Sequence, residues 1–238
     1  MANFPFQRLQ SDLASLIERT PAGSRLVSEP ELAKQLGVSR ATLREAMRTF
    51  ETQGLIRRRQ GAGTFVVGQV PIMDAGLEVL ESIDTMARRL NLAVTVSDLE
   101  VERIDADDKH ARKLGIGVGS CVTRVRRVMR ADTRPVAYLI DALPEEVLRV
   151  EDLPNQFDGS VLDFMLERGD DLRISRAAIS ATNASAEVAK ALEIQRGDVL
   201  LKFSSQLYTS DGKVVDYTLS YFIPGYFNFH VVRRIGNS

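Results

Sequence analysis

The sequence has few of the residues from which catalytic and metal sites are usually built. Its 238 residues include one cysteine, Cys121, and two histidines, His110 and His230. A single cysteine excludes an internal disulfide and a metal site made of several cysteines. Neither histidine lies at the spacing of a catalytic triad or a zinc site, and no P-loop or dinucleotide fingerprint is present. The sequence therefore predicts neither a metal nor a cofactor, and we interpret Cys121 as a quiet buried thiol.

Long apolar runs are also missing. No stretch reaches the length of a membrane span, and residues 1–20 show no signal-peptide pattern. These features predict a cytoplasmic protein without membrane association. The 31 basic and 32 acidic residues nearly cancel, which at first argues against a partner such as nucleic acid.

The near balance hides an asymmetry along the chain. Residues 1–67 contain 10 Lys and Arg against 6 Asp and Glu, whereas the remainder contains 21 basic and 26 acidic residues. A basic part followed by an acidic part is typical of a nucleic-acid-binding domain joined to a domain with another task. A chain of 238 residues is long enough for two ordinary domains, each with its own core.

Three helices are predicted in the basic part. Leucines and isoleucines at intervals of three or four predict the first over about residues 6–19. The second is expected to begin after Ser28 as N-cap and to end at Gly37. The third is expected to begin after Ser39, another N-cap, and to run to Gln53. Since only two residues separate Gly37 from the third helix, the pattern predicts a helix-turn-helix.

The third helix is amphipathic and basic on its outer side. Its apolar stripe consists of Leu43, Ala46, Met47 and Phe50. Arg44 and Arg48 lie opposite this stripe, with Arg40 and Thr42 flanking it at the first turn. The next segment, "GLIRRRQGAGTFVV", predicts two short strands around a glycine-rich turn that contains Gly61 and Gly63. A hairpin after the third helix makes the unit a winged helix.

These residues resemble the GntR family of bacterial repressors over roughly residues 10–67. The family pattern "LPSERELA", "GVSRTTVREAL", "GLI" and "G-x-G-T-F-V" is matched here by "LVSEPELA", "GVSRATLREAM", "GLI" and "GAGTFV". Two positions depart from it, because Pro30 replaces a DNA-contacting arginine and Val27 replaces a proline. The resemblance implies a homodimer that binds an inverted repeat in double-stranded DNA. The implied DNA contacts are Arg25, Ser39, Arg40, Thr42, Arg44, Arg59, Gln60, Gly61 and Gly63.

Two arginines near this surface have a plainer interpretation. Arg48 lies farther from the start of the helix and can be solvated without touching DNA. Arg57 can pair with Glu51 or Glu45 on the surface, a kind of ion pair that contributes little stability.

The rest of the chain predicts an α+β domain. Residues 68–95 form a join, in which residues 77–92 have the spacing of an amphipathic helix that packs between domains. From residue 96 to 238, short helices alternate with hairpins, which indicates an antiparallel sheet. A weak internal repeat places residues 111–144 over residues 189–224, so that Leu114 meets Leu192. Two helix–hairpin units sharing a sheet would leave a cleft.

This second part resembles the UTRA ligand-sensing domain of the HutC branch of the GntR family, which shares its fold with chorismate lyase. The most telling pieces are the turn that ends at Pro135, "GSVLDFML" and "GKVVDYTLSYF". The resemblance implies that a small effector binds here and changes the affinity for DNA. The expected domains are therefore a DNA-binding domain over residues 1–67, a join over 68–95 and an effector-binding domain over 96–238.

One arginine of this domain is placed unusually. In "CVTRVRRVMRA", Arg127 shares a face with Val125 and Met129, and an arginine on an apolar face needs an anionic partner. Arg127 also falls where the family has an anion-binding arginine, whereas Met129 replaces a second one. We therefore expect a small anionic effector. The neighbouring arginines of the strand, Arg124, Arg126 and Arg130, point the other way and are expected to be solvated.

Other family pocket positions fall on Ser160, Leu162, Asp216 and Phe222. Sugar-phosphate sensors of the branch carry Tyr, Glu and Tyr at the last three. The loss of two hydroxyls and one arginine implies a smaller or partly apolar acid rather than a phosphosugar. Two alternatives stay open: Asp216 can pair within the fold, for example with Arg127, and Ser160 can serve only as a helix N-cap.

Two other classes of function compete with a ligand-responsive regulator. The kinship with a lyase suggests an enzyme, but the sequence offers no catalytic constellation. An architectural DNA binder without an effector is the third class, and a separate acidic α+β domain argues against it. We expect a transcription regulator that is not an enzyme, acts as a repressor, and is released from its operator by its effector.

Overall fold

The structure is a computed structural model, and it describes the whole chain except residues 1–3, 60–61, 68–72 and 234–238. The chain divides after residue 72 into two compact units, and the turn at residues 224–226 groups with the first. Each unit has its own hydrophobic core. No helix within these described ranges is long and apolar enough to cross a membrane.

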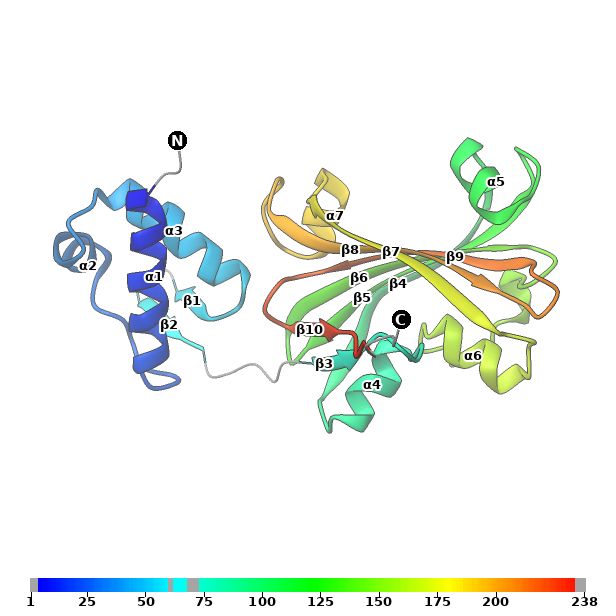
Figure 1. Ribbon diagram of the computed structural model, residues 1–238, viewed down its shortest axis with the longest axis horizontal. Coiled ribbons are helices and arrows are strands. Elements are labelled where there is room, and N and C mark those ends of the chain that lie inside the picture. The colour runs from blue at the N-terminus through cyan, green and yellow to red at the C-terminus, as the bar shows by residue number, and fades with distance from the viewer. Residues whose placement is uncertain (1–3, 60–61, 68–72, 234–238) are drawn as a thin grey trace, which may run out of the picture. The chain divides into compact units, whose positions relative to one another are not determined.

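The first unit is a three-helix core followed by a β-hairpin (Figure 1). Its elements are α1 (Phe4–Arg19), α2 (Glu29–Gln35), α3 (Arg40–Thr52), β1 (Ile56–Arg59) and β2 (Gly63–Val66). The apolar stripe of α3 is buried against α1 and α2, with Leu43 and Ala46 at 0% exposure. This arrangement confirms the predicted winged helix-turn-helix. The turn between α2 and α3 uses Gly37 at a φ of 66°, a conformation that glycine adopts without strain.

The helix starts of this unit differ in how they are capped. Ser39 accepts a hydrogen bond from the backbone N–H of Thr42, as predicted for an N-cap. Ser28 occupies the N-cap position of α2, but its side chain makes no capping hydrogen bond. Pro30 lies in the first turn of α2, where its missing N–H costs no helical bond.

The second unit is built on one six-stranded antiparallel sheet with the order β4-β5-β6-β9-β8-β7. Its long strands are β4 (Val94–Asp105), β5 (Cys121–Ala131), β6 (Arg134–Pro144), β7 (Ile174–Asn183), β8 (Val199–Tyr208) and β9 (Val214–Phe222). The other elements are β3 (Met73–Gly76), α4 (Ile83–Arg89), α5 (Asp108–Leu114), η1 (Val150–Asp152), α6 (Val161–Arg168), α7 (Ala186–Ala191) and β10 (Phe227–His230). The sheet and its helices confirm the predicted α+β fold.

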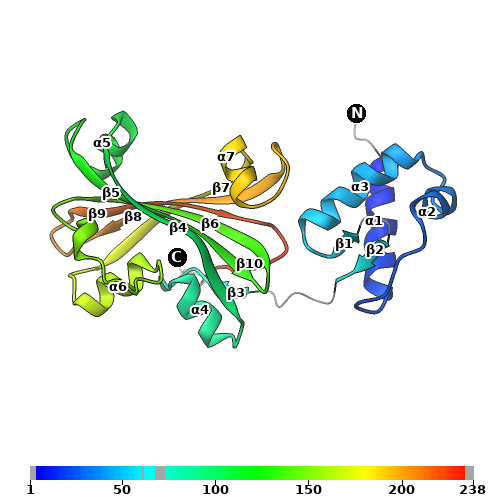
Figure 2. The same ribbon diagram turned by 180° about the vertical axis from the view of Figure 1, so that it is seen from behind.

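The two faces of the sheet are covered differently, as Figures 1 and 2 show from opposite sides. Helices α5 and α7 lie on one face. On the other face lie α4, α6 and the small parallel pair β3–β10. The strand order also shows the predicted repeat, because β4-α5-β5-β6 and β7-α7-β8-β9 meet at the central pair β6–β9. Equivalent residues Leu114 and Leu192 are both buried.

The helix predicted over residues 77–92 is wrong in its first half. Residues 73–76 form β3, which pairs with β10, and α4 begins only at Ile83. Ser82 caps α4 by accepting a hydrogen bond from the N–H of Thr85. The helical spacing gave the wrong prediction because β3 pairs with β10, a strand about 150 residues later in the chain. The N–H of Leu77 extends this pairing by donating to the carbonyl of His230. Both β3 and α4 belong to the second unit.

Candidate functional site

The outer surface of α3 carries the side chains that the sequence assigned to DNA. Arg40, Thr42 and Arg44 are all exposed, opposite the buried stripe. Ser39 Oγ lies 2.8 Å from Thr42 Oγ1, and either hydroxyl can be the donor. One hydroxyl hydrogen therefore serves this contact and the other is left for an external acceptor. A phosphate at the start of α3 would also meet the unpaired N–H groups of its first turn.

Arg44 is held in place by an acid of the neighbouring helix. Its Nε donates to Glu29 Oε2 at 2.6 Å, and the side chain remains 57% exposed. Glu29 also lies 3.6 Å from Arg58 Nε, and Arg58 Nη2 donates to the carbonyl of Arg44. Glu29 of α2 thus links α3, through Arg44, to β1 of the wing, through Arg58. An exposed ion pair of this kind adds little stability but restricts where the guanidinium points.

The wing brings a further predicted residue to the same unit. Arg25 pairs with Phe65 of β2 in an isolated β-bridge, and its side chain is exposed. It lies against Gly63, where a Cβ would come 2.5 Å from Arg25 Nε. Gly63 also has a φ of 111°, so glycine here makes room for Arg25 as well as shaping the turn. The backbone of Arg59 pairs with Gly63, whereas its side chain, Gln60 and Gly61 lie outside the described residues.

The plainer interpretations of Arg48 and Arg57 are resolved differently. Arg48 is half-buried and lies 3.9 Å from Glu45, rather than being fully solvated. The sequence predicted Glu51 or Glu45 as the partner of Arg57, but Glu51 lies 3.6 Å from the neighbouring arginine, Arg58. Arg57 is exposed. Side chains alternate along β1, so a shift of one residue exchanges the inner and outer arginines.

The second unit contains a cavity of about 500 Å³ on the sheet face that carries α4 and α6. The sheet strands β5 to β9 form its floor, residues 75–86 form one wall, and the start of α6 contributes Ser160 and Leu162. The four predicted effector residues, Arg127, Ser160, Asp216 and Phe222, all line this cavity. The structure thus brings together positions that are up to 95 residues apart in sequence.

Strand register explains how the charged groups meet. Arg127 on β5 stands opposite Leu139 on β6, and Asp141 on β6 stands opposite Thr218 on β9. Alternation along each strand places these residues on the face that carries the cavity. The Arg127 guanidinium donates from Nη1 to Asp141 Oδ2, and both side chains are at least nine-tenths buried. The anionic partner that the sequence required for Arg127 is therefore Asp141, not Asp216.

Asp216 takes part in the same network through Thr218. The Thr218 hydroxyl lies 3.0 Å from Asp141 Oδ1 and 2.9 Å from Asp216 Oδ2. A hydroxyl has one proton, so both contacts are hydrogen bonds only if a carboxyl carries a proton as well. Burial, together with the nearby charge of Asp141, raises the pKa of Asp216 well above its usual range. These surroundings therefore favour the neutral form of the Asp216 carboxyl.

Three buried polar atoms on the cavity wall lack a hydrogen-bond partner among the described residues. They are Arg127 Nε, Ser160 Oγ and Asp216 Oδ1. Ser160 occupies the N-cap position of α6, yet its side chain makes no capping hydrogen bond. The sequence therefore placed Ser160 correctly at the start of α6, but the side-chain cap that it allowed for is not formed. Buried polar groups are normally satisfied by protein or by water, so these three atoms keep hydrogen-bonding capacity for a molecule in the cavity.

A further acid, Asp84 near the start of α4, faces the cavity from residues 75–86. Burial raises the pKa of Asp84, which the positive charge of Arg127 partly offsets. Asp158 and Asp163 add to the upward shift. Several carboxyl groups thus lie in the surroundings of Arg127.

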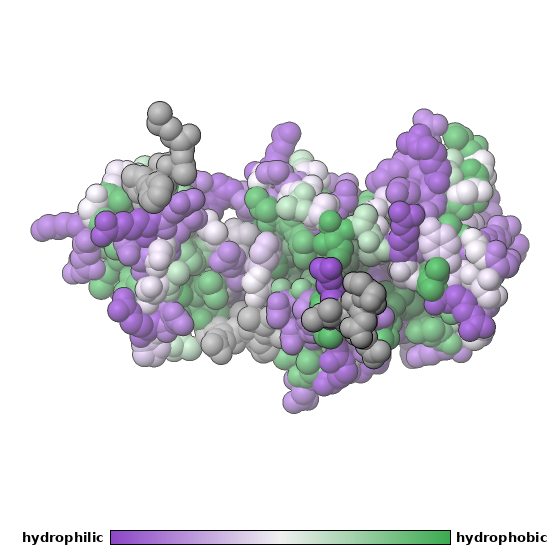
Figure 3. Space-filling model, in the orientation of Figure 1, coloured by the Kyte–Doolittle hydropathy of each residue, from purple (hydrophilic) through white to green (hydrophobic). Residues whose placement is uncertain are grey.

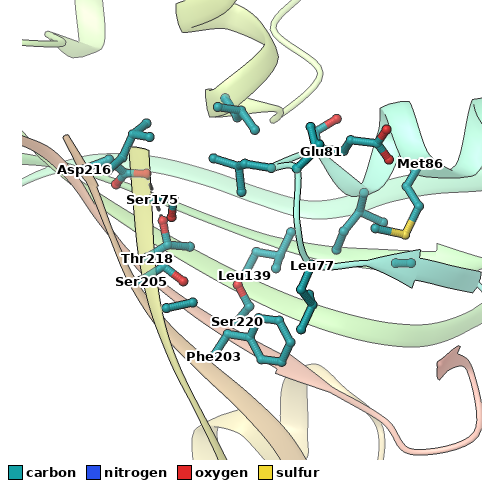
Figure 4. Close-up of a pocket in the computed structure, with 18 of the residues that line it drawn as sticks. Leu77, Glu81, Met86, Leu139, Ser175, Phe203, Ser205, Asp216, Thr218 and Ser220 are labelled. Carbon is teal, nitrogen blue, oxygen red and sulfur yellow. Dashed lines mark hydrogen bonds between the residues drawn. The ribbon is translucent and has the colours of Figure 1, made fainter. Parts of the chain in front are cut away.

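The remaining lining is divided between hydroxyls and apolar groups (Figure 4). Ser175, Ser205, Thr218 and Ser220 lie along the strands on one side, while Leu77 and Met86 lie on the opposite side. Phe222 belongs to an aromatic cluster, with its ring 5.2 Å from that of Phe203 and 4.9 Å from that of Phe229. In Figure 3, apolar side chains also gather in the middle of the visible face of this unit, below α7.

The other arginines of β5 are paired rather than solvated. Arg124 and Arg126 each bind Glu102 of β4, at 2.8 and 2.9 Å, and Arg130 binds Glu193 at 2.7 Å. Their side chains are only 21–28% exposed. Acids on the neighbouring strand and after α7, which the spacing within β5 could not reveal, supply these partners. Cys121 is half-buried, not buried, and its Sγ accepts from Arg103 at 2.8 Å.

The sequence prediction missed two acids of the cavity, and only one of them leaves a signal. Asp141 is the one charged residue in the otherwise apolar run "PVAYLIDAL", and a lone acid in a buried strand needs a partner. Asp84 was part of the polar side of the expected helix 77–92, where no pattern separates a buried acid from a solvated one. The hydroxyls of β8 and β9 carry no signal, since serine and threonine are common on half-buried strands.

The comparisons with known proteins agree with this architecture. Residues 6–66 match the bacterial regulatory proteins of the gntR family, and residues 89–228 match the UTRA domain. The transcriptional repressor NagR of Bacillus subtilis is 30% identical over 88% of this chain and 86% of its own. The transcriptional regulator Rv0792c of Mycobacterium tuberculosis is 32% identical over 90% of this chain and 79% of its own.

Solved structures show the same fold over nearly the whole chain. PhnF from Mycobacterium smegmatis superposes with a TM-score of 0.65 at 22% identity, covering 96% of this chain and 100% of that one. YydK from Bacillus subtilis gives a TM-score of 0.58 at 20% identity and covers 97% and 99%. The family matches and the curated relatives concern transcription regulators, so the enzyme and architectural alternatives are not favoured. The chain belongs to the gntR family of bacterial regulatory proteins and carries a UTRA domain behind its winged helix-turn-helix unit.

Proposed function

We propose that the protein is a cytoplasmic repressor that binds an operator as a homodimer and leaves it when a small metabolite fills the cavity of the second unit. The observation that carries this proposal is the composition of the cavity wall. Residues 75–86 line the cavity, and they follow closely on the segment that joins the two units. A ligand in the cavity therefore touches the part of the chain through which a change must reach the DNA-binding unit.

The DNA side of the proposal rests on α3 and the wing. Two short reading helices related by two-fold symmetry would recognise an inverted repeat, which gives a dimer enough contacts for specificity. Arg40 and Arg44 would contact base edges or phosphates, and Ser39 and Thr42 would bind phosphate. Arg25, Arg59, Gln60, Gly61 and Gly63 would contribute through the wing.

The chemistry of the effector is the part that the structure changes most. The sequence predicts a small anion held by Arg127, with Ser160, Asp216 and Phe222 around it. All four line the cavity, but Asp141 already neutralises Arg127. We therefore keep the proposed sensing role of these four residues, but Arg127 is already paired and no longer supports an anionic effector.

The test of the proposed function uses the full chain and DNA. Selection from random DNA should yield an inverted repeat, and analytical ultracentrifugation should find two chains on each site. A monomer on DNA, or a selected motif without symmetry, would contradict the proposal. A small-molecule screen for loss of operator binding then tests the sensing role, and release with an Ile179→Trp variant that narrows the cavity should be weaker than release with the wild type.

A further inference from the structure

The described lining of the cavity contains more acidic than basic side chains. The rim groups are engaged elsewhere: Arg173 lies 3.2 Å from Asp171, Glu81 accepts from Arg89 at 2.9 Å, and Glu78 accepts from the N–H of Val232. In the interior, Arg127 is the one cation among the described lining residues, and it faces Asp84, Asp141 and Asp216. Because Asp141 already balances Arg127, the other two carboxyl groups, Asp84 and Asp216, have no further cation among the described interior residues.

The buried polar atoms of the cavity wall that lack a hydrogen-bond partner among the described residues also bear on the kind of ligand. Asp216 Oδ1 is a buried acceptor and Ser160 Oγ a buried hydroxyl that can accept or donate, and neither has a hydrogen-bond partner among the described residues. The two residues are 5% and 2% exposed. Both atoms can accept, so together they suit a molecule that donates hydrogen bonds. An anion that bound the free N–H groups of Arg127 would instead have to share this cation with Asp141, which already neutralises its charge. Arg127 Nε is the one unsatisfied atom that can only donate, and it suits a neutral oxygen of the ligand.

We propose that the interior of the cavity binds a positively charged, hydrogen-bond-donating group of a small metabolite, such as a protonated amine, with Asp216 as its counter-ion and Ser160 as a second acceptor. The inference rests on the proposed sensing function and names the class of its ligand. The body of the molecule lies on the hydroxyls of Ser205 and Ser220 and on the Phe203 and Phe222 rings, which suits a frame that is part polar and part apolar.

Binding of an ammonium group changes the protonation of Asp216. Without a cation, burial and the charge of Asp141 raise the pKa of this carboxyl, which favours its protonated form. A positive charge beside it favours the ionised form and lowers the pKa. The carboxyl of Asp216 then releases its proton to solvent, and the resulting carboxylate pairs with the ammonium group of the ligand. An anion would have the opposite effect and would not release a proton from this group.

The test compares three probes that share one ring and differ in the head group: 2-phenylethylamine, 2-phenylethanol and phenylacetate, with inorganic phosphate as a fourth. Thermal shift of the full chain should show stabilisation by the amine above that by the alcohol, and none by phenylacetate or phosphate. Titration calorimetry in two buffers of different ionisation enthalpy should detect proton release on binding the amine. Asp216→Asn should weaken amine binding at least tenfold, and the matched exposed variant Asp132→Asn should leave it unchanged.

The outcomes separate the ligand class from the sensing function. Tighter binding of phenylacetate or phosphate that depends on Arg127, or no stabilisation by the amine, overturns the inference. If those anions also release operator DNA, the sensing function stands and only the class of ligand is wrong. If the amine binds through Asp216 yet leaves operator binding unchanged at saturation, the inference stands and the proposed release mechanism is wrong.

Discussion

The two units place their charged residues in opposite ways. In the first unit, the arginines assigned to function stand on an exposed helix face around a core of apolar side chains. In the second, Arg127, Asp141 and Asp216 lie inside the fold, each 7% exposed or less. Exposed charges are screened and act mainly on partners, whereas buried ones must be balanced by the fold itself. The same residue type, arginine, is therefore solvent-exposed in one unit and buried in an ion pair in the other.

The largest effect is expected where the buried pair is broken. Arg127→Met leaves Asp141 buried without its counter-ion, and breaking such a pair costs about 3–5 kcal/mol of stability. Urea denaturation followed by tyrosine fluorescence would measure it, because all five tyrosines lie beyond residue 137. The exposed variant Arg176→Met is the control, with a change within about 0.5 kcal/mol. Partial recovery in Arg127→Met/Asp141→Leu would sharpen the assignment, whereas wild-type stability of the single variant would refute it.

The corresponding change in the first unit should affect binding and not folding. Arg40→Ala and Arg44→Ala should each weaken operator binding by about 1–3 kcal/mol if the arginine contacts a base. Stability should hardly change, since the Arg44–Glu29 pair is exposed and such pairs contribute about 0–1 kcal/mol. Electrophoretic mobility shift and thermal unfolding measure the two quantities. A folded double variant that binds its operator at wild-type affinity would show that α3 is not the reading helix.

A smaller effect with a defined pH dependence is expected for Asp216. Its pKa is raised in the folded protein, so its contribution to stability is fully present below the ordinary value of about 4 and is lost as pH rises towards the raised value. Asp216→Asn has no such loss and should be more stable than the wild type at pH 7–8. The difference should shrink towards pH 4. Urea denaturation at several pH values checks this, and a difference that grows on acidification would mean that Asp216 is ionised in the empty cavity.

The smallest effect concerns the start of the reading helix. Ser39→Ala removes the hydrogen bond that caps α3 and should cost about 1 kcal/mol of stability. Ser28→Ala is the matched control, because Ser28 stands at an N-cap without making a capping bond. Thermal unfolding of the two variants compares them directly. Equal losses would show that the capping difference between α2 and α3 has no energetic consequence.

The sequence alone predicted much of the first unit. Helix periodicity, N-cap residues and a glycine-bounded turn are local signals, and they gave the helices and the wing to within about two residues. It also predicted the α+β fold of the second unit and four residues that meet at its cavity. Ser160, Asp216 and Phe222 came from a resemblance between motifs, which carries positions along the chain without their partners. Arg127 also stood out by itself, as an arginine on the apolar face of a strand.

Tertiary structure decided which charges meet. Arg127 lies near Asp141 because β5 and β6 pair in one register, and a shift of one residue would turn either side chain to the other face. Residues 73–76 form a strand because β10 lies beside them, although their sequence neighbours have helical spacing. Local propensity is set by a residue and its neighbours along the chain, whereas ion pairing and burial depend on residues brought from elsewhere. The sequence therefore determined the fold of each unit and the exposed face of α3 that we assign to DNA. Only the folded sheet decided that Arg127 is already paired, and that Asp216 Oδ1 and Ser160 Oγ lie at the cavity without a hydrogen-bond partner among the described residues.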